Sequence, residues 1–245
     1  MSIGGMRYRA DGRTPGQMRP VSIQMDVQKW ASASLIYKQG DTHVLCSATV
    51  EDRVPPHLRG KGTGWVTAEY AMLPGATSER MQRESVRGKL GGRTYEIQRL
   101  VGRSLRGVVD TSVMGERTVM IDCDVLQADG GTRCASITGG YIALVLALRK
   151  VKLEKAIISK IAAISVGIVG DSALMDLEYT EDSGAEVDFN VIGTDAGTYV
   201  ELQGTAEGKP FDRGQMDTLL DLADSGLKSL FDIQAKVLAG ESGAA

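Results

Sequence analysis

Short segments in which apolar and polar residues partly alternate dominate the first seventy positions. They are rich in β-branched residues and are separated by Gly, Pro and Asp, a pattern typical of strands. Over 93–109 the pattern changes to a helical spacing, with apolar residues on one side and Arg99, Arg103 and Arg106 on another. The sequence therefore predicts an amphipathic helix with an arginine stripe, preceded by strands at 21–28, 34–38, 43–50 and 65–72.

The rest of the chain continues the alternation of strands and helices. A strand is predicted at 117–127 and a nearly continuous apolar helix at 135–149, followed by a charged connector. Further strands are predicted at 163–169, 174–179, 186–192 and 199–204, and a closing helix at 212–238. This order predicts an α+β fold in which mixed β-sheets pack with helices.

No Pro/Ser-rich linker or short repeat divides the chain. We therefore expect a single domain over 7–239 with two related halves, a flexible lead-in over 1–6 and a C-terminal tail over 240–245.

Composition places the chain among globular proteins. Its 245 residues are 42% hydrophobic, which is enough for a sizeable core, and no run approaches the roughly 18 apolar residues of a membrane helix. Cys46, Cys123 and Cys134 have no metal-ligand spacing and lie in apolar or small-residue stretches. We interpret them as reduced core thiols and expect a cytoplasmic protein without membrane contact.

Charge is divided unequally along the chain, although the net charge is only -3. Up to Gly107 there are 17 Lys and Arg against 9 Asp and Glu, whereas the remainder has 11 against 22. Such an asymmetry indicates polyanion binding by the basic part. The alternative is two solvated faces of opposite sign.

Two glycine segments precede predicted helices, and each contains an arginine. Gly91-Gly92-Arg93-Thr94 opens the arginine-striped helix, and Gln127-Ala-Asp-Gly-Gly-Thr-Arg133 lies at a strand-to-helix turn. Glycines allow a close backbone approach, a helix start offers free N–H groups, and a guanidinium suits phosphate. The lysine and spacing of a P-loop and the GxGxxG pattern are missing, which disfavours nucleotide-triphosphate and dinucleotide folds. Plain turns are the alternative for each segment alone.

Two other charged clusters are candidates for chemistry. The acidic one comprises Glu178, Glu181, Asp182, Glu186 and Asp188. Alternation along an extended segment places the last two carboxylates on one face, where they would suit a magnesium ion that keeps most of its waters. The basic cluster, Arg80, Arg83 and Arg87, would contact phosphates rather than stack on bases. Solvated loops are the alternative for both, and His43 and His57 are assigned structural roles.

Several ordered motifs together resemble the ribonuclease PH family, over nearly the whole chain. They are Arg9-Ala-Asp-Gly-Arg13, Val50-Glu-Asp-Arg-Val-Pro-Pro56, Gly64-Trp-Val-Thr-Ala-Glu-Tyr70, Met72-Leu-Pro74, Gly92-Arg-Thr-Tyr-Glu-Ile-Gln-Arg99, Asp122-Cys-Asp-Val-Leu-Gln-Ala-Asp-Gly-Gly-Thr-Arg133 and Ala185-Glu-Val-Asp-Phe-Asn190.

The resemblance implies a ribosomal protein S5 domain 2-like fold and a homohexameric ring built as a trimer of dimers. It also implies Mg²⁺ or Mn²⁺ as cofactor and inorganic phosphate as co-substrate. The reaction would trim the 3′ ends of tRNA precursors and other RNAs, release nucleoside 5′-diphosphates and run backward as nucleotide addition. This is a phosphate-dependent nucleotidyltransferase activity, with no DNA substrate expected.

Motif matching carries the family's site residues onto this chain. Arg93, Gly131, Thr132 and Arg133 would bind phosphate, and Arg80 and Arg83 fall in the loop associated with tRNA binding. Asp182 and Asp188 would be the catalytic and metal-associated aspartates, with Asp182 the candidate for protonating the leaving 3′ oxygen. Two positions depart from the family pattern, because Gln17-Met18 precede Arg19-Pro20 and Gly75 stands where a basic residue often follows Leu-Pro.

A rival hypothesis is a catalytically silent RNA-binding subunit of an exosome-like ring. A silent subunit need not keep both the arginines and the aspartates, whereas this chain has Arg93, Arg133, Asp182 and Asp188 together. An unrelated phosphate-binding enzyme would leave the acidic strand unexplained. The sequence therefore favours the active enzyme.

Overall fold

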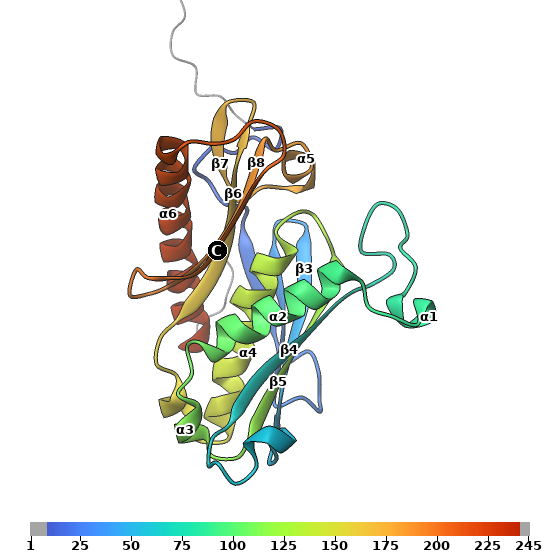
Figure 1. Cartoon of the computed structure of the whole chain (residues 1–245), viewed down its shortest axis with the longest axis vertical. Helices are drawn as coiled ribbons and strands as arrows, with labels where there is room; N and C mark the ends of the chain where they lie inside the picture. Colours follow the sequence, from blue (N-terminus) through green and yellow to red (C-terminus); the bar gives the residue numbers. More distant parts are fainter. Residues whose placement is uncertain (1–8, 241–245) are drawn as a thin grey trace, which may run out of the picture.

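The computed structural model describes residues 9–240 of the chain, which form two β-sheets and three long helices (Figure 1). The lead-in predicted over 1–6 lies outside these residues, as does the predicted tail except for Gly240. The order of elements follows the predicted order of strands, helices, strands and helix.

The first sheet has five strands in the order β1-β2-β3-β5-β4. Its pairs are antiparallel except for β4 and β5, which run parallel because α2 makes the connection between them. Alternate residues are buried on one face, as Val44, Cys46 and Ala48 show on β3. The strands are β1 (Val21–Met25), β2 (Ala33–Gln39), β3 (Thr42–Glu51), β4 (Trp65–Met72) and β5 (Thr118–Gln127).

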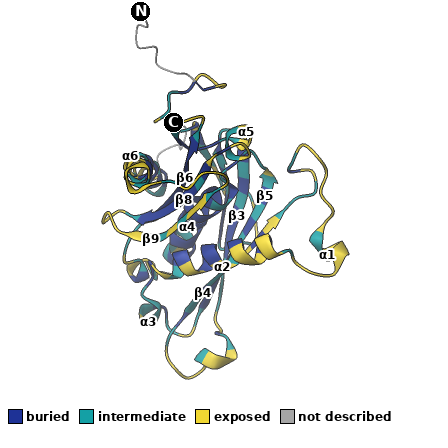
Figure 2. Cartoon of the chain, turned by 45° about the horizontal axis from the view of Figure 1, so that its top comes forward, coloured by how far each residue is buried: buried dark blue, intermediate teal, exposed yellow. Residues whose placement is uncertain are grey.

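The second sheet has four antiparallel strands in the order β7-β6-β8-β9. The central strand β6 is buried along nearly its whole length, because helices cover both of its faces. Figure 2 shows this burial for β6 and β8, whereas β9 at the edge is mostly exposed. The strands are β6 (Ile161–Val169), β7 (Ser172–Met175), β8 (Val187–Thr194) and β9 (Tyr199–Ala206).

The helix α4 (Thr132–Lys150) lies between the two sheets and is buried on almost every side. Its close approach to the first sheet needs glycine, because a Cβ at Gly139 would lie 2.8 Å from Cys46 Sγ. Helix α2 (Gly92–Arg106) covers β4 beside it, and α6 (Arg213–Leu238) covers the other face of the second sheet. The core therefore consists of alternating sheet and helix layers. Among the described helices, none has the length and apolarity needed to cross a membrane.

Two predicted strands end earlier than expected at an aspartate with positive φ. The prediction of strand at 174–179 is wrong beyond Met175, because Asp176 has a φ of 54° and a short helix, α5 (Tyr179–Asp182), follows. The first predicted strand likewise ends at Met25, because Asp26 has a φ of 56°. The sequence also gave no sign of four other short helices, which are η1 (Pro56–Leu58), α1 (Glu84–Arg87), α3 (Thr111–Met114) and η2 (Glu154–Ala156).

Candidate active site

The turn before α4 is shaped to expose backbone N–H groups. Gly130 and Gly131 have φ angles of 71° and 67°, which only glycine adopts easily, and α4 begins at Thr132. The Thr132 hydroxyl is fixed by the hydroxyl of Tyr70 on β4 at 3.0 Å. The first N–H groups of an α-helix have no partner within the helix, and the helix dipole places partial positive charge there. This turn is therefore a ready site for an anion.

Two arginines add full positive charge near the turn. Arg133 is largely buried, with its Nη1 donating to Gln203 Oε1 at 2.7 Å and lying 3.7 Å from Glu96 Oε1. Arg93 is exposed in the first turn of α2 and has no ion-pair partner among residues 9–240. Arg93 is therefore free to bind an anion, whereas Arg133 has a fixed orientation.

Asp182 at the end of α5 and Asp188 on β8 are both half-buried carboxylates. Burial raises the pKa of Asp182, while the charges of Arg93, Arg133 and Arg19 oppose the rise. Burial and the neighbouring Asp182 charge raise the pKa of Asp188 to about 6, against the effects of Arg133, Arg93 and a hydrogen bond from Asn190. The aspartates and the two site arginines thus share one electrostatic environment.

A cavity of about 610 Å³ joins four of the eight predicted site residues. Arg93, Gly131, Thr132 and Asp182 all line it, although they come from three separate helices or their starts. Arg133 and Asp188 do not line the cavity, but each interacts electrostatically with Asp182, which does. The two glycine-and-arginine motifs and the acidic cluster, which are separate in the sequence, therefore contribute to one cavity.

The opposite wall of the cavity belongs to the segment between β4 and α2, which projects from the body of the molecule (Figures 1 and 2). Thr77, Ser78 and Met81 line the cavity from this segment. Arg80 and Arg83 are exposed on it and make no salt bridge among the described residues. The two predicted RNA-binding arginines therefore lie close to the cavity wall.

Sequence reasoning missed two contacts that shape the cavity. Glu84 Oε1 accepts bonds from Gly91 N and Thr94 Oγ1, both at 2.9 Å, and so fastens the start of α2 to α1. Tyr70 supports Thr132 as described above. A buried tyrosine hydroxyl usually has a hydrogen-bond partner, so the sequence could have indicated that Tyr70 has one. It could not have identified Thr132, which is distant in the chain.

The donor set of Asp182 and Asp188 suits a hydrated divalent cation. The charge of Asp182 raises the pKa of Asp188, and a cation bound near the two carboxylates would stabilise their ionised forms. No cluster of three or more His, Cys, Asp or Glu among residues 9–240 could hold a metal ion by itself. Mg²⁺ commonly binds through one or two carboxylates plus substrate phosphates and waters, so the two aspartates fit this ion.

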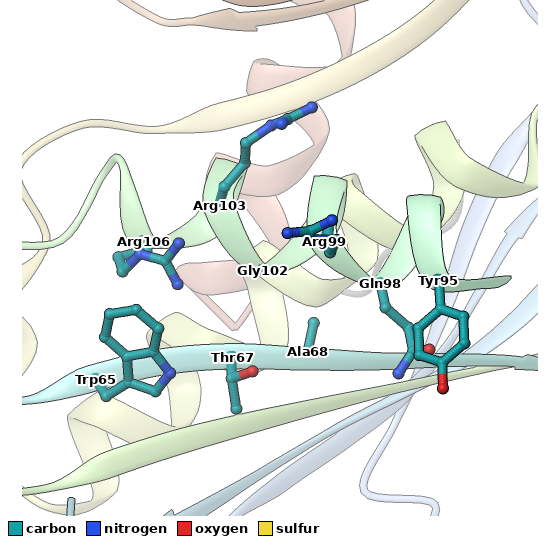
Figure 3. A pocket seen from close by; sticks show the side chains of 9 residues that line it. All are labelled: Trp65, Thr67, Ala68, Tyr95, Gln98, Arg99, Gly102, Arg103 and Arg106. Carbon is teal, nitrogen blue, oxygen red and sulfur yellow. The ribbon is translucent and has the colours of Figure 1, made fainter. Parts of the chain in front are cut away.

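The arginine stripe lies in a second groove, of about 450 Å³, between α2 and β4 (Figure 3). Arg106 stacks over the Trp65 ring at 4.0 Å from its centroid, and Arg103 is paired with Glu201 on β9. Arg99 lines the same groove without an ion pair among the described residues. The predicted stripe is thus present, with only part of its charge neutralised.

Comparison with known proteins agrees with this geometry. Residues 17–150 match the model of the 3′ exoribonuclease family, domain 1, and residues 160–226 match that of domain 2. A relative named Ribonuclease PH, from Syntrophomonas wolfei subsp. wolfei, is 55% identical over 236 residues, covering 94% of this chain and 98% of the relative. The chain belongs to the ribonuclease PH family.

Solved structures confirm the fold of the ribonuclease PH family in this chain. Rice (Oryza sativa) Rrp46 has a TM-score of 0.77 at 18% identity, with 94% of this chain and 100% of that chain covered. An Archaeoglobus fulgidus exosome with RNA bound to the active site has a TM-score of 0.76 at 22% identity, with 92% of each chain covered. The predicted α+β fold is therefore confirmed.

Proposed function

We propose that this chain shortens RNA from its 3′ end by phosphorolysis, with tRNA precursors as substrates. The observation that carries the proposal is the cavity that Arg93, the N-terminal turn of α4 and Asp182 line together. Positive groups that suit inorganic phosphate thus border the same cavity as a group that can exchange a proton. Membership of the ribonuclease PH family supports the same reaction.

The positive groups serve the attacking phosphate. A phosphate dianion must approach a phosphodiester anion, and Arg93, Arg133 and the N–H groups around Thr132 lower this repulsion while fixing the line of attack. A phosphate oxygen bonds to the terminal phosphorus, and the bond from that phosphorus to the preceding 3′ oxygen breaks. The terminal nucleotide leaves as a nucleoside 5′-diphosphate, and an excess of nucleoside 5′-diphosphate reverses the step.

The leaving 3′ oxygen needs a proton, for which Asp182 is the proposed donor. Burial raises its pKa, which increases the protonated fraction near neutral pH relative to a solvated aspartate. Asp188, and Asp182 in its ionised form, would hold Mg²⁺ or Mn²⁺, and when bound this cation would neutralise charge on the scissile phosphate.

The RNA and the assembly belong to the same proposal. Arg80 and Arg83, exposed on the projecting segment, would contact the phosphates of tRNA. Six copies would form a ring as a trimer of dimers in the cytoplasm, where the buried thiols of Cys46, Cys123 and Cys134 stay reduced. The silent-subunit hypothesis is disfavoured, because three of the four predicted phosphate-site residues, Arg93, Gly131 and Thr132, line one cavity together with Asp182.

The function is tested by incubating the pure protein and magnesium with a tRNA that carries extra 3′ nucleotides, with and without inorganic phosphate. We expect shortening only when phosphate is present. Shortening that proceeds equally without phosphate would contradict phosphorolysis, and a full-length RNA under both conditions would favour a silent subunit.

A further inference from the structure

Buried arginines in the segment before β1 lie beneath the active site. Arg9, Arg13 and Arg19 are each less than 10% exposed, although arginine is rarely buried unless it is paired. All three contact Asp176, through its backbone carbonyl or its carboxylate. Only Arg19 among them also contacts the glycine turn that starts α4.

Arg19 bridges two acidic residues on either side of the site. Its Nε and Nη2 donate to the two carboxylate oxygens of Asp176 at 3.0 and 2.7 Å, and its backbone N–H donates to the same carboxylate at 2.7 Å. Its Nη1 donates to the backbone carbonyl of Asp129 and lies 3.3 Å from that residue's carboxylate. A planar guanidinium can make these contacts simultaneously, and an ammonium group cannot.

Asp129 in turn links the glycine turn to α5, the helix that carries Asp182. Its Oδ1 accepts a bond at 3.1 Å from the backbone N–H of Tyr179, the first residue of α5. A Cβ at Gly130 would collide with the carbonyl of Leu177, so the two segments already touch. The separation between the turn and α5 is therefore set by Arg19 and Asp129.

Thr42 on β3 also holds this turn, and its hydroxyl lies 3.5 Å from Arg19 Nη1. Its hydroxyl donates to the Gly130 carbonyl at 2.6 Å and accepts from Asp129 N at 3.1 Å. Arg19 Nη2 lies 3.4 Å from the place that a Cβ on Gly131 would take, directly behind the turn. The guanidinium thus supports the turn from within the protein, and Arg19 is absent from the lining of the cavity.

We propose that Arg19 and Asp129 are positioning residues for phosphorolysis, which hold the phosphate-binding turn at a fixed separation from Asp182. This inference rests on the proposed function, because the turn and Asp182 are taken as the two halves of its active site. Neither residue is assigned a chemical step. Arg19 acts from behind the cavity, through the backbone N–H groups of the turn, and Asp129, which also lines the cavity, acts through the placement of α5.

The test uses Arg19→Lys in the full-length protein, with Arg13→Lys as the matched control. Arg13 is as buried as Arg19 and also contacts Asp176, but it makes no contact with Asp129. Its 3.7 Å ion pair with Glu181 of α5 is backed by the closer bonds from Arg9 to the same carboxylate, and a lysine at 13 keeps the positive charge. Steady-state phosphorolysis of a 3′-extended tRNA gives kcat and the KM for inorganic phosphate, and a melting curve gives the stability of each variant. Displacement of a binding group by about 1 Å can cost on the order of 100-fold in rate.

We expect Arg19→Lys to raise the KM for phosphate and lower kcat, each by about 10-fold or more. Arg13→Lys should lower the melting temperature and keep both kinetic constants at wild-type values. Added phosphate should raise the melting temperature of Arg13→Lys as it does that of the wild type, and that of Arg19→Lys much less. A purely structural role would give both variants lower stability and unchanged kinetic constants, which would overturn the proposal.

A second pair of variants decides the question if Arg19→Lys does not fold. Asp129 is partly exposed, so Asp129→Ala should fold while losing the side-chain contacts to Arg19 and Tyr179 and keeping the Arg19 bond to its backbone carbonyl. Asp129→Asn keeps an acceptor for Tyr179 N–H and should recover part of the activity. Equal kinetic constants for wild type and Asp129→Ala would contradict the inference. If the proposed function itself is wrong, the wild type will show no phosphate-dependent shortening of the tRNA. This result differs from one in which only the variants behave unexpectedly.

Discussion

At the residue scale, the anion site depends on which positive groups are free to bind. Arg93 is exposed and has no salt bridge among residues 9–240, so its removal should cost little folding stability. A hydrogen bond to a charged group contributes about 1.5–3 kcal/mol, so Arg93→Ala should raise the KM for phosphate by about 10-fold to 100-fold at a nearly unchanged melting temperature. Arg213→Ala, which removes an exposed arginine of α6, should leave this KM unchanged. An unaltered KM in Arg93→Ala would exclude Arg93 from the phosphate site.

At the element scale, the parallel pair β4 and β5 carries carboxylates that repel one another. Glu69 lies directly opposite Asp122, and burial together with the charges of Glu69 and Asp124 raises the pKa of Asp122. Because the folded pKa lies above the unfolded one, the ionised carboxyl destabilises the fold as pH rises through that range. Asp122→Asn should therefore stabilise the protein at pH 7 by roughly 0.2–1 kcal/mol.

This gain should disappear at a pH low enough to protonate the carboxyl group in the wild type. Melting curves at the two pH values measure the difference. The control is Asp232→Asn on the exposed side of α6, which should show no such pH-dependent gain. Equal melting temperatures of wild type and Asp122→Asn at pH 7 would contradict the repulsion.

The helices and their starts also show how far the sequence predicts this structure. The helices α2 and α6 follow from their apolar periodicity, and the motifs around Arg93 and Thr132 correctly predicted two helix starts with an arginine nearby. The helix α5 was missed because the chain turns at Asp176, whose carboxylate is bound by Arg19, 157 positions earlier in the sequence. A local pattern contains no information about such a distant partner. The link between the glycine turn and Asp182 was missed for the same reason.

At the scale of the whole molecule, the modest net charge hides a basic part and an acidic part that meet at one cavity. The edge strand β9 exposes Tyr199, Val200 and Leu202, as expected of a strand that another subunit covers. This agrees with the proposed hexamer. Native mass spectrometry should find a species of six times the 26.1 kDa chain mass. A protein that stays a single chain at working concentration would contradict the ring.

The central claim is that inorganic phosphate is the attacking group, and the fate of labelled phosphate tests it most directly. The protein is incubated with magnesium, a 3′-extended tRNA and radiolabelled inorganic phosphate, and the released nucleotides are separated by chromatography. The account predicts nucleoside 5′-diphosphates that carry the label in the outer phosphate. Unlabelled nucleoside 5′-monophosphates would show that water attacks instead, and would contradict the account.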